Sequence, residues 1–127
     1  MTRVMVIDDD PFVLELLDGV LTEAGYTVVT SDTADELCAQ VAEHEPNVLI
    51  LDLGMPGLDG RKAALALLAS GKRVPILFYS ARPTAELNAI CHEIPRTSFV
   101  TKGTPMRTLL GSVRRLTRAS GFFGAPD

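Results

Sequence analysis

Short apolar runs alternate along the chain with longer segments whose apolar residues recur every three or four positions. A continuous β-branched run is typical of a strand buried on both faces, and three-to-four spacing is typical of a helix with one buried side. The pattern predicts five strands, at residues 4–7, 26–30, 48–51, 75–79 and 98–101. It predicts five helices, beginning at Pro11, Thr33, Arg61, Thr84 and Thr104.

The helix ends carry signals of their own. Asp10 is predicted to cap the first helix, with Pro11 at its first position and Gly25 at its end. Thr33 and Glu36 have the spacing of a capping box, which predicts that the second helix opens there. The apolar side of the first helix is predicted to consist of Phe12, Val13, Leu16, Leu17, Val20 and Leu21.

Strict alternation of strand and helix predicts the α/β class, with a five-stranded parallel sheet covered by helices on both faces, a flavodoxin-like (βα)5 arrangement. Right-handed crossovers then define most of the topology. The 127 residues suit one domain, expected over residues 1–119 and followed by a frayed tail at 120–127, so we expect a single-domain protein with no output domain.

The composition excludes several classes of protein. Apolar residues make up 46% and charged residues 22%, as in an average globular domain, and no apolar run approaches the roughly 20 residues of a membrane-spanning helix. A net charge of -4 does not favour general nucleic-acid binding. Cys38 and Cys91 lack metal-ligand spacing, and with no signal peptide they suggest free thiols in the cytoplasm.

Polar residues follow the predicted strands at the point where each strand ends. Asp8 and Asp9 follow the first strand, Asp52 the third, Ser80 the fourth and Lys102 the fifth. Because the carboxyl ends of parallel strands meet at one edge of the sheet, where open α/β sheets bind ligands, we expect these side chains to form one cluster.

Like charges gathered in this way need compensation. Two carboxylates about 4 Å apart repel by about 4 kcal/mol at an effective dielectric near 20. Lys102 offsets one charge, and a divalent cation with oxygen ligands, Mg²⁺, would offset the rest. Alternatively, the aspartates at 8–10 only cap the first helix and favour its dipole. Asp52 does not fit that alternative, because a Gly/Pro loop and not a helix follows it.

At these residues the chain resembles the receiver domain of bacterial two-component response regulators, over nearly its whole length. The motifs that carry the resemblance are Val6-Ile7-Asp8-Asp9-Asp10, Leu51-Asp52-Leu53-Gly54-Met55-Pro56-Gly57-Leu58-Asp59-Gly60, Tyr79-Ser80-Ala81 and Phe99-Val100-Thr101-Lys102. The resemblance implies that Asp52 is the phosphoacceptor. It implies that Asp8, Asp9, Asp52 and the backbone carbonyl of Gly54 hold Mg²⁺.

The resemblance assigns roles to three further residues. Ser80 occupies the position of the hydroxyl that hydrogen-bonds the phosphoryl group, and Lys102 is its cationic partner. Phe99 occupies the switch aromatic position, although an ordinary core position is the alternative reading. Movement of Ser80 toward the phosphoryl group would make room for Phe99 and so couple the chemistry to the surface of the fourth helix, fifth strand and fifth helix.

The chain departs from the family pattern at the predicted output surface. Gly103 follows Lys102 where the family has a proline in a cis peptide bond, and Pro95-Arg96 stand where it has a Gly-Ala pair. Gly54 and Arg82 occupy positions that govern how water reaches the phosphoryl group in this family. Arginines on the last helix are either a docking stripe for a partner or a solvated surface: Arg107, Arg114, Arg115 and Arg118.

The predicted function is that of a signalling domain, not of an enzyme. The chain is expected to take a phosphoryl group from a histidine kinase or a histidine phosphotransfer protein onto Asp52, and then to bind a downstream protein, without direct nucleic-acid binding or membrane insertion. Two alternatives stay open here. One is a haloacid-dehalogenase-like phosphatase that uses Asp8 as its nucleophile, and the other is an interaction module that works without phosphorylation.

Overall fold

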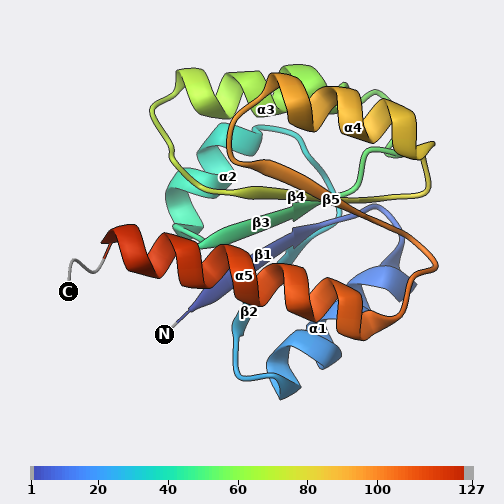
Figure 1. The fold of residues 1–127 in the computed structure, drawn as a ribbon, viewed down its shortest axis with the longest axis vertical. Coiled ribbons are helices and arrows are strands. Elements are labelled where there is room, and N and C mark those ends of the chain that lie inside the picture. The colour runs from blue at the N-terminus through green and yellow to red at the C-terminus, as the bar shows by residue number, and fades with distance from the viewer. Residues whose placement is uncertain (1, 125–127) are drawn as a thin grey trace.

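The chain folds into one parallel sheet with the strand order β2-β1-β3-β4-β5 (Figure 1). This computed structural model describes residues 2–124, and the side chains of residues 2–118. The strands are β1 (Arg3–Ile7), β2 (Thr27–Ser31), β3 (Val48–Leu51), β4 (Ile76–Ser80) and β5 (Thr97–Thr101). The helices are α1 (Pro11–Glu23), α2 (Leu37–His44), α3 (Gly60–Ala69), α4 (Thr84–Glu93) and α5 (Met106–Gly124). The predicted fold class is confirmed.

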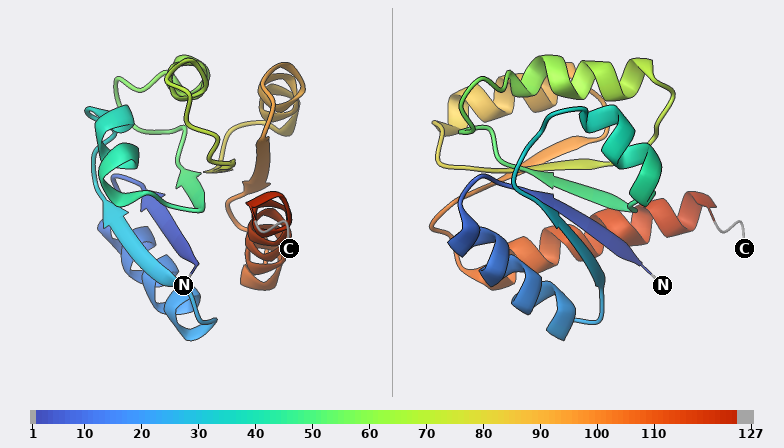
Figure 2. Two further views of the ribbon diagram at one scale, coloured as in Figure 1. Left: turned by 90° about the vertical axis from the view of Figure 1, so that its left-hand side faces the viewer. Right: turned by 180° about the vertical axis from the view of Figure 1, so that it is seen from behind.

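Helices cover both faces of the sheet. Figures 1 and 2 show α1 and α5 on one face and α2, α3 and α4 on the other. The sheet residues divide accordingly, because successive strand side chains point to opposite faces. Val4 and Val6 pack with α1 and α5, whereas Met5 and Ile7 pack with the other three helices. Each fully buried side chain of this kind contributes about 1.5–3 kcal/mol.

The position of each strand in the sheet explains its hydrophobic pattern. The strand β3 is buried at all four of its residues and β4 at all five, since each has a strand on both sides and helices on both faces. The edge strands β2 and β5 are only partly buried and contain threonine and serine. Both cysteines are free thiols, partly buried against the core.

The first helix begins and ends as predicted, but two of the residues predicted to lie on its apolar contact side are exposed. Asp10 Oδ1 accepts a hydrogen bond of 2.9 Å from the Phe12 amide, and Gly25, at φ 102°, follows the helix. The expectation that Phe12 and Leu16 belong to the apolar contact side was wrong, since they are 71% and 40% exposed. Their i, i+4 spacing places them together, whereas Leu14, which was not predicted to face the core, packs against it beside the buried Leu17.

The predicted capping box of the second helix was also wrong. The helix α2 begins only at Leu37, and Glu36 before it is left-handed at φ 51°. Thr33 Oγ1 accepts a hydrogen bond from the Asp35 amide at 3.0 Å, which makes a local turn in place of a helix cap. The Gln40 side chain donates to the carbonyls of Thr33 and Asp35, at 3.0 and 2.8 Å, and so fixes that turn.

The last helix also differs in extent from the expectation. It begins at Met106, two residues after the expected start at Thr104, and continues to Gly124. The segment 120–124, expected to be frayed, is therefore helical, and residues 125–127 lie outside the described residues. None of the helices in residues 2–124 combines the length and apolar character needed to span a bilayer.

Candidate functional site

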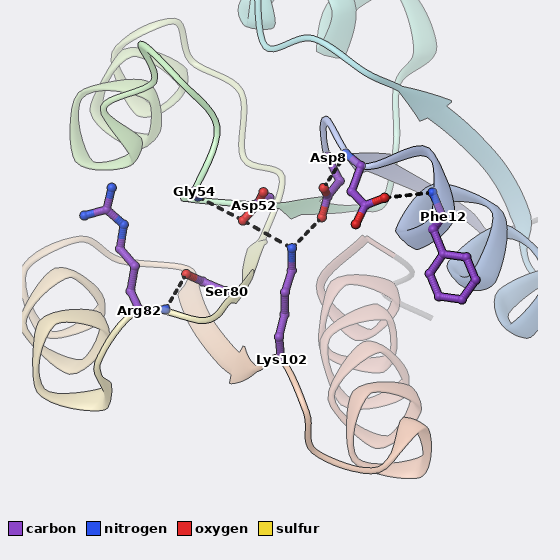
Figure 3. Close-up of polar contacts among 8 residues, drawn as sticks. Asp8, Phe12, Asp52, Gly54, Ser80, Arg82 and Lys102 are labelled. Carbon is purple, nitrogen blue, oxygen red and sulfur yellow. Dashed lines mark hydrogen bonds and ion pairs between the residues drawn. The ribbon is translucent and has the colours of Figure 1, made fainter.

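Three charged side chains meet at the carboxyl edge of the sheet (Figure 3). Asp8 follows β1, Asp52 follows β3 and Lys102 follows β5. The Lys102 Nζ lies 2.9 Å from Asp8 Oδ2 and 3.5 Å from Asp52 Oδ1. β1 and β3 are neighbours from which the chain continues in opposite directions across the sheet, so the site lies at the topological switch point, where this class of fold binds ligands.

The Asp8 carboxylate is held on both of its oxygens. Its Oδ1 accepts a hydrogen bond from the Asp10 amide at 2.9 Å, and its Oδ2 accepts one from Lys102 Nζ at 2.9 Å. The residue is 2% exposed. A buried carboxylate is stable only when paired and hydrogen-bonded, and both conditions are met here.

The Asp52 carboxylate is nearly as buried, at 5% exposure. Its Oδ1 accepts a hydrogen bond of 2.9 Å from the Gly54 amide and also faces Lys102. Burial raises the pKa of the Asp52 carboxyl above its ordinary value; the Gly54 hydrogen bond lowers it, and the negative charge of Asp8 raises it further. Asp52 is thus a carboxylate that is costly to keep charged without added positive charge.

The ammonium group of Lys102 lies between the two buried carboxylates. Partial burial lowers its pKa, but the hydrogen bond to Asp8 and the charges of Asp52 and Asp8 raise it more, so the net shift is upward. The Nζ also lies 5.6 Å from the centre of the Tyr79 ring, within the range of a cation–π contact. The lysine is therefore charged and fixed in place at neutral pH.

Asp9 completes an acidic cluster that could hold a cation. One carboxylate oxygen from each of Asp8, Asp9 and Asp52 lies within 4.8 Å of the others. Asp9 is exposed, whereas Asp8 and Asp52 are buried, so the cluster is open to solvent on the Asp9 side. An all-oxygen ligand set with access to water suits Mg²⁺, which retains several waters of its own.

Ser80 lies at the same edge, but its hydroxyl is turned toward the next loop. The residue is fully buried at the end of β4, and its Oγ accepts a hydrogen bond of 3.0 Å from the Arg82 amide (Figure 3). The Arg82 guanidinium forms an ion pair of 2.7 Å with Glu86, one turn along α4. Ser80 is thus placed with the cluster without bonding to Asp52.

Two glycines shape the loop after Asp52. A Cβ on Gly54 would lie 3.4 Å from Asp52 Oδ1, so the absence of a side chain keeps that side of the carboxylate uncovered. A Cβ on Gly60 would lie 1.8 Å from Leu53 Cδ2, so only glycine permits this close packing. The loop ends at Asp59, whose Oδ1 accepts a hydrogen bond from the Lys62 amide at 3.1 Å and caps α3.

Phe99, to which the resemblance assigns the switch role, lies on β5, and Gly103 lies in the loop after it. Phe99 is partly buried and packs against the core cluster that contains Phe78, its partner across the β4–β5 pair. Gly103 has φ 100°, a left-handed conformation that favours glycine. The loop from Lys102 into α5 therefore turns through a residue suited to that conformation, and this accounts physically for glycine at that position.

Sequence reasoning missed two features near the site. The exposure of Phe12 beside the acidic cluster could not be read from the helical spacing, because apolar residues fill too wide an arc of α1. An ion pair between Arg61 of α3 and Glu93 of α4 joins two helices through residues 32 positions apart. No sequence signal specified that pairing.

A parallel α/β sheet with an acidic cluster and a lysine at its switch point defines a class of domain suited to metal-assisted phosphoryl chemistry. The family model of the response regulator receiver domain matches residues 4–114. This chain therefore belongs to the receiver domains of two-component response regulators. The family match decides against the phosphatase alternative built on Asp8.

The curated relatives of this chain include mycobacterial regulators. The transcriptional regulatory protein KdpE of Mycobacterium tuberculosis is 36% identical over 118 residues, which covers 93% of this chain and 52% of KdpE. The response regulator MprA of Mycobacterium ulcerans is 32% identical over 116 residues, with 91% of this chain and 50% of MprA covered. The chain thus spans about half the length of these relatives.

Solved structures agree with this assignment. The response regulator TrrA of Thermotoga maritima, in complex with Mg(2+)-BeF, has a TM-score of 0.79 at 27% identity, covering 91% of this chain and 99% of TrrA. Chemotaxis protein CheY4 of Vibrio cholerae has a TM-score of 0.81 at 25% identity, covering 91% and 98%. The receiver domain of a LuxO repressor protein from Vibrio parahaemolyticus, at 16% identity, shares the fold with a TM-score of 0.90, covering 99% and 97%.

Proposed function

We propose that Asp52 accepts a phosphoryl group from a histidine kinase or a histidine phosphotransfer protein, and that the phosphorylated chain binds a downstream protein. The observation that carries the proposal is the buried Asp52 carboxylate, 3.5 Å from Lys102 and within the acidic cluster. In this reading the chain is a signalling domain and not an enzyme that turns over a substrate. The proposed reaction takes place in the cytoplasm.

The acidic cluster suits Mg²⁺ as the cofactor. Asp8, Asp9 and Asp52 would supply carboxylate oxygens, and the backbone carbonyl of Gly54 would supply a fourth protein ligand. Two of the three carboxylates are buried with a single lysine between them, so the described side chains leave negative charge that a divalent cation would balance. When bound, the ion supplies positive charge close to the oxygens of the transferring phosphoryl group.

The chemistry follows from the residues themselves. A carboxylate oxygen of Asp52 attacks the phosphorus of a phosphohistidine, forming an acyl phosphate. The bond from phosphorus to the imidazole nitrogen breaks, and its electron pair stays on that nitrogen, which then takes up a proton. Lys102, already fixed beside Asp52, compensates the charge on the phosphoryl oxygens.

The expected switch begins at Ser80. Its hydroxyl would leave the Arg82 amide, from which it accepts a 3.0 Å hydrogen bond, and donate to a phosphoryl oxygen. The vacated space would admit the ring of Phe99, which already packs against the core on that side of the sheet. A change at β5 would then alter the surface formed by α4, β5 and α5, to which we assign downstream binding.

The exposed apolar residues of α1 fit a docking surface for the phosphodonor protein. Phe12 is 71% exposed and Leu16 40%, and they lie on one side of the helix that follows the acidic residues of the site. In Figure 3 the Phe12 ring points away from the acidic side chains. A donor that covers this ring would bury apolar area next to the carboxylate that it must reach.

Mass spectrometry after treatment with acetyl phosphate tests the proposal. With Mg²⁺ the parent chain is expected to gain the mass of one phosphoryl group, and chelation by EDTA is expected to abolish that gain. Asp52→Asn should gain none, and equal labelling of that variant would overturn the assignment of the acceptor. Glu23→Gln, at an exposed acidic residue at the end of α1, serves as the matched control.

A further inference from the structure

The outer side of α5 carries a stripe of arginines. Arg107, Arg114 and Arg118 repeat at spacings of seven and four residues, which places them on one side of the helix, with Arg115 beside them. All four are exposed, whereas Leu109 and Val113 on the opposite side are fully buried. The ribbon in Figure 1 shows α5 on the outside of the sheet layer. We call these four residues the arginine stripe.

The arginine stripe has no internal counter-charge. No aspartate or glutamate occurs in the sequence of α5, and within the described side chains, residues 2–118, none of the four arginines forms an ion pair. Two exposed arginines elsewhere are neutralised within the chain, since Arg61 of α3 pairs with Glu93 and Arg82 pairs with Glu86. The stripe therefore presents several unneutralised guanidinium groups to its surroundings.

Charge is segregated along the whole chain. Residues 4–60 contain no lysine or arginine but many carboxylates, and residues 94–126 contain no carboxylate. A net charge of -4 thus conceals a strongly acidic half and a basic last helix. The two carboxylates of α4, Glu86 and Glu93, are already paired within the chain. A second copy that docked symmetrically through this surface would place arginine against arginine, which disfavours self-association there.

We infer that the arginine stripe is the docking site of an acidic helix of a partner protein. The inference rests on the proposed function and gives the chemistry of its downstream partner. From Arg107 to Arg118 the stripe extends about 16 Å at 1.5 Å per residue, which a partner helix of a few turns matches with carboxylates at the same spacings. Guanidinium–carboxylate pairs supply the specificity.

The centre of the stripe leaves room for such a helix. Gly111 lies between Arg107 and Arg114 on the exposed side, and a Cβ there would meet nothing within 4 Å. A long nucleic-acid duplex fits the arginine stripe less well than an acidic α-helix of a protein does. The α5 start lies four residues after Lys102, next to the edge that carries Asp8 and Asp9, and that acidic edge repels a uniform polyanion.

Fluorescence anisotropy with a labelled Glu-rich helical peptide of about 18 residues tests the inference, because that length spans the stripe. The double variant Arg107→Glu/Arg114→Glu is expected to bind about tenfold more weakly than the parent, as is Gly111→Glu, which inserts a carboxylate into the stripe. Gly111→Ala and Arg73→Glu are the matched controls, since the first adds no charge and the second reverses an exposed arginine elsewhere. Both should bind as the parent does.

The controls also separate this inference from the proposed function. Phosphorylation by acetyl phosphate should be unchanged in every one of these variants, so loss of peptide binding with normal phosphorylation supports the stripe alone. Equal weakening by Arg73→Glu would overturn the inference, as would tighter binding of a DNA duplex than of the peptide. Salt-sensitive dimerisation in sedimentation velocity that Arg107→Glu abolishes would also overturn it, because the occupant would then be a second copy.

Discussion

The Lys102 ammonium reaches back across 94 residues of sequence to the Asp8 carboxylate, at 2.9 Å, and in doing so lies 3.5 Å from Asp52. One cation thus partly balances two buried carboxylates in the metal-free chain. In the same position, the ammonium would also compensate the negative charge of a phosphoryl group on Asp52. Stability and chemistry are therefore coupled at this residue, because any change in the charge of the cluster alters how well it is balanced.

Replacement of Lys102 separates its electrostatic effects on folding and on metal binding. Lys102→Ala is expected to lower the stability of the metal-free chain by about 3 kcal/mol, because it leaves two buried carboxylates without their cation. The same variant should bind Mg²⁺ more tightly than the parent, since a competing positive charge is gone. Thermal denaturation against Mg²⁺ concentration measures both effects.

The exposed Lys72 supplies the control for that substitution. Lys72→Ala should leave the melting temperature and its dependence on Mg²⁺ within error of the parent. A Lys102→Ala variant whose melting temperature responds less to Mg²⁺ than that of the parent would contradict the electrostatic account.

Neutralising Asp52 should stabilise the chain when no metal is present. Burial raises the pKa of Asp52, so its charged form is disfavoured in the folded state. Asp52→Asn removes that charge and keeps a side chain of similar shape. The expected gain in the free energy of unfolding is roughly 1–2 kcal/mol at pH 7, which is smaller than the repulsion of about 4 kcal/mol between two charges 4 Å apart at a dielectric near 20. Urea denaturation in EDTA measures it.

The gain should depend on pH with a definite sign. A carboxyl whose folded pKa is raised favours folding fully below its unfolded value, near 3.8, and loses that contribution as pH rises through the folded pKa. The difference between Asp52→Asn and the parent should therefore grow from acidic to neutral pH. A difference that stayed constant from pH 4 to pH 8 would show that the charge of Asp52 is not its source.

Packing at Gly60 is predicted to support the loop that carries Asp52. In Gly60→Ala the new Cβ would lie 1.8 Å from Leu53 Cδ2, so Leu53 or the start of α3 must move, at a cost of about 1–3 kcal/mol. Gly111→Ala, in open space within α5, should instead stabilise the chain by about 0.5–1 kcal/mol. Chemical denaturation of both variants gives the comparison, and equal effects of the two would rule out the steric explanation.

The sequence predicted the arrangement of the backbone and the meeting of Asp8, Asp52 and Lys102 because those features follow from periodicity and strand order. A parallel sheet brings strand ends to one edge whatever the side chains do there.

The orientation of individual side chains could not be predicted in this way. The hydroxyl of Ser80 bonds to the Arg82 amide, and the Thr33 hydroxyl makes a turn and not a helix cap, because local hydrogen bonds compete with the predicted ones. Contacts between helices, such as that of Arg61 with Glu93, depend on tertiary packing that no local pattern encodes.

Phosphotransfer from a protein donor should depend on Phe12, whereas phosphorylation by a small molecule should not. Phe12→Ala removes the most exposed apolar side chain named at the site without touching the carboxylates or the core, since the ring is 71% exposed. The rate of transfer from a phosphorylated histidine phosphotransfer protein is expected to fall about tenfold through weaker docking, as for loss of an aromatic contact at an interface. The rate with acetyl phosphate should match that of the parent.

Leu68→Ala, at a 38% exposed leucine of α3, is the control and should leave both rates unchanged. If Phe12→Ala slows phosphorylation equally with both donors, Phe12 acts in the chemistry or in folding and not in docking. If it slows neither, α1 is not part of the docking surface.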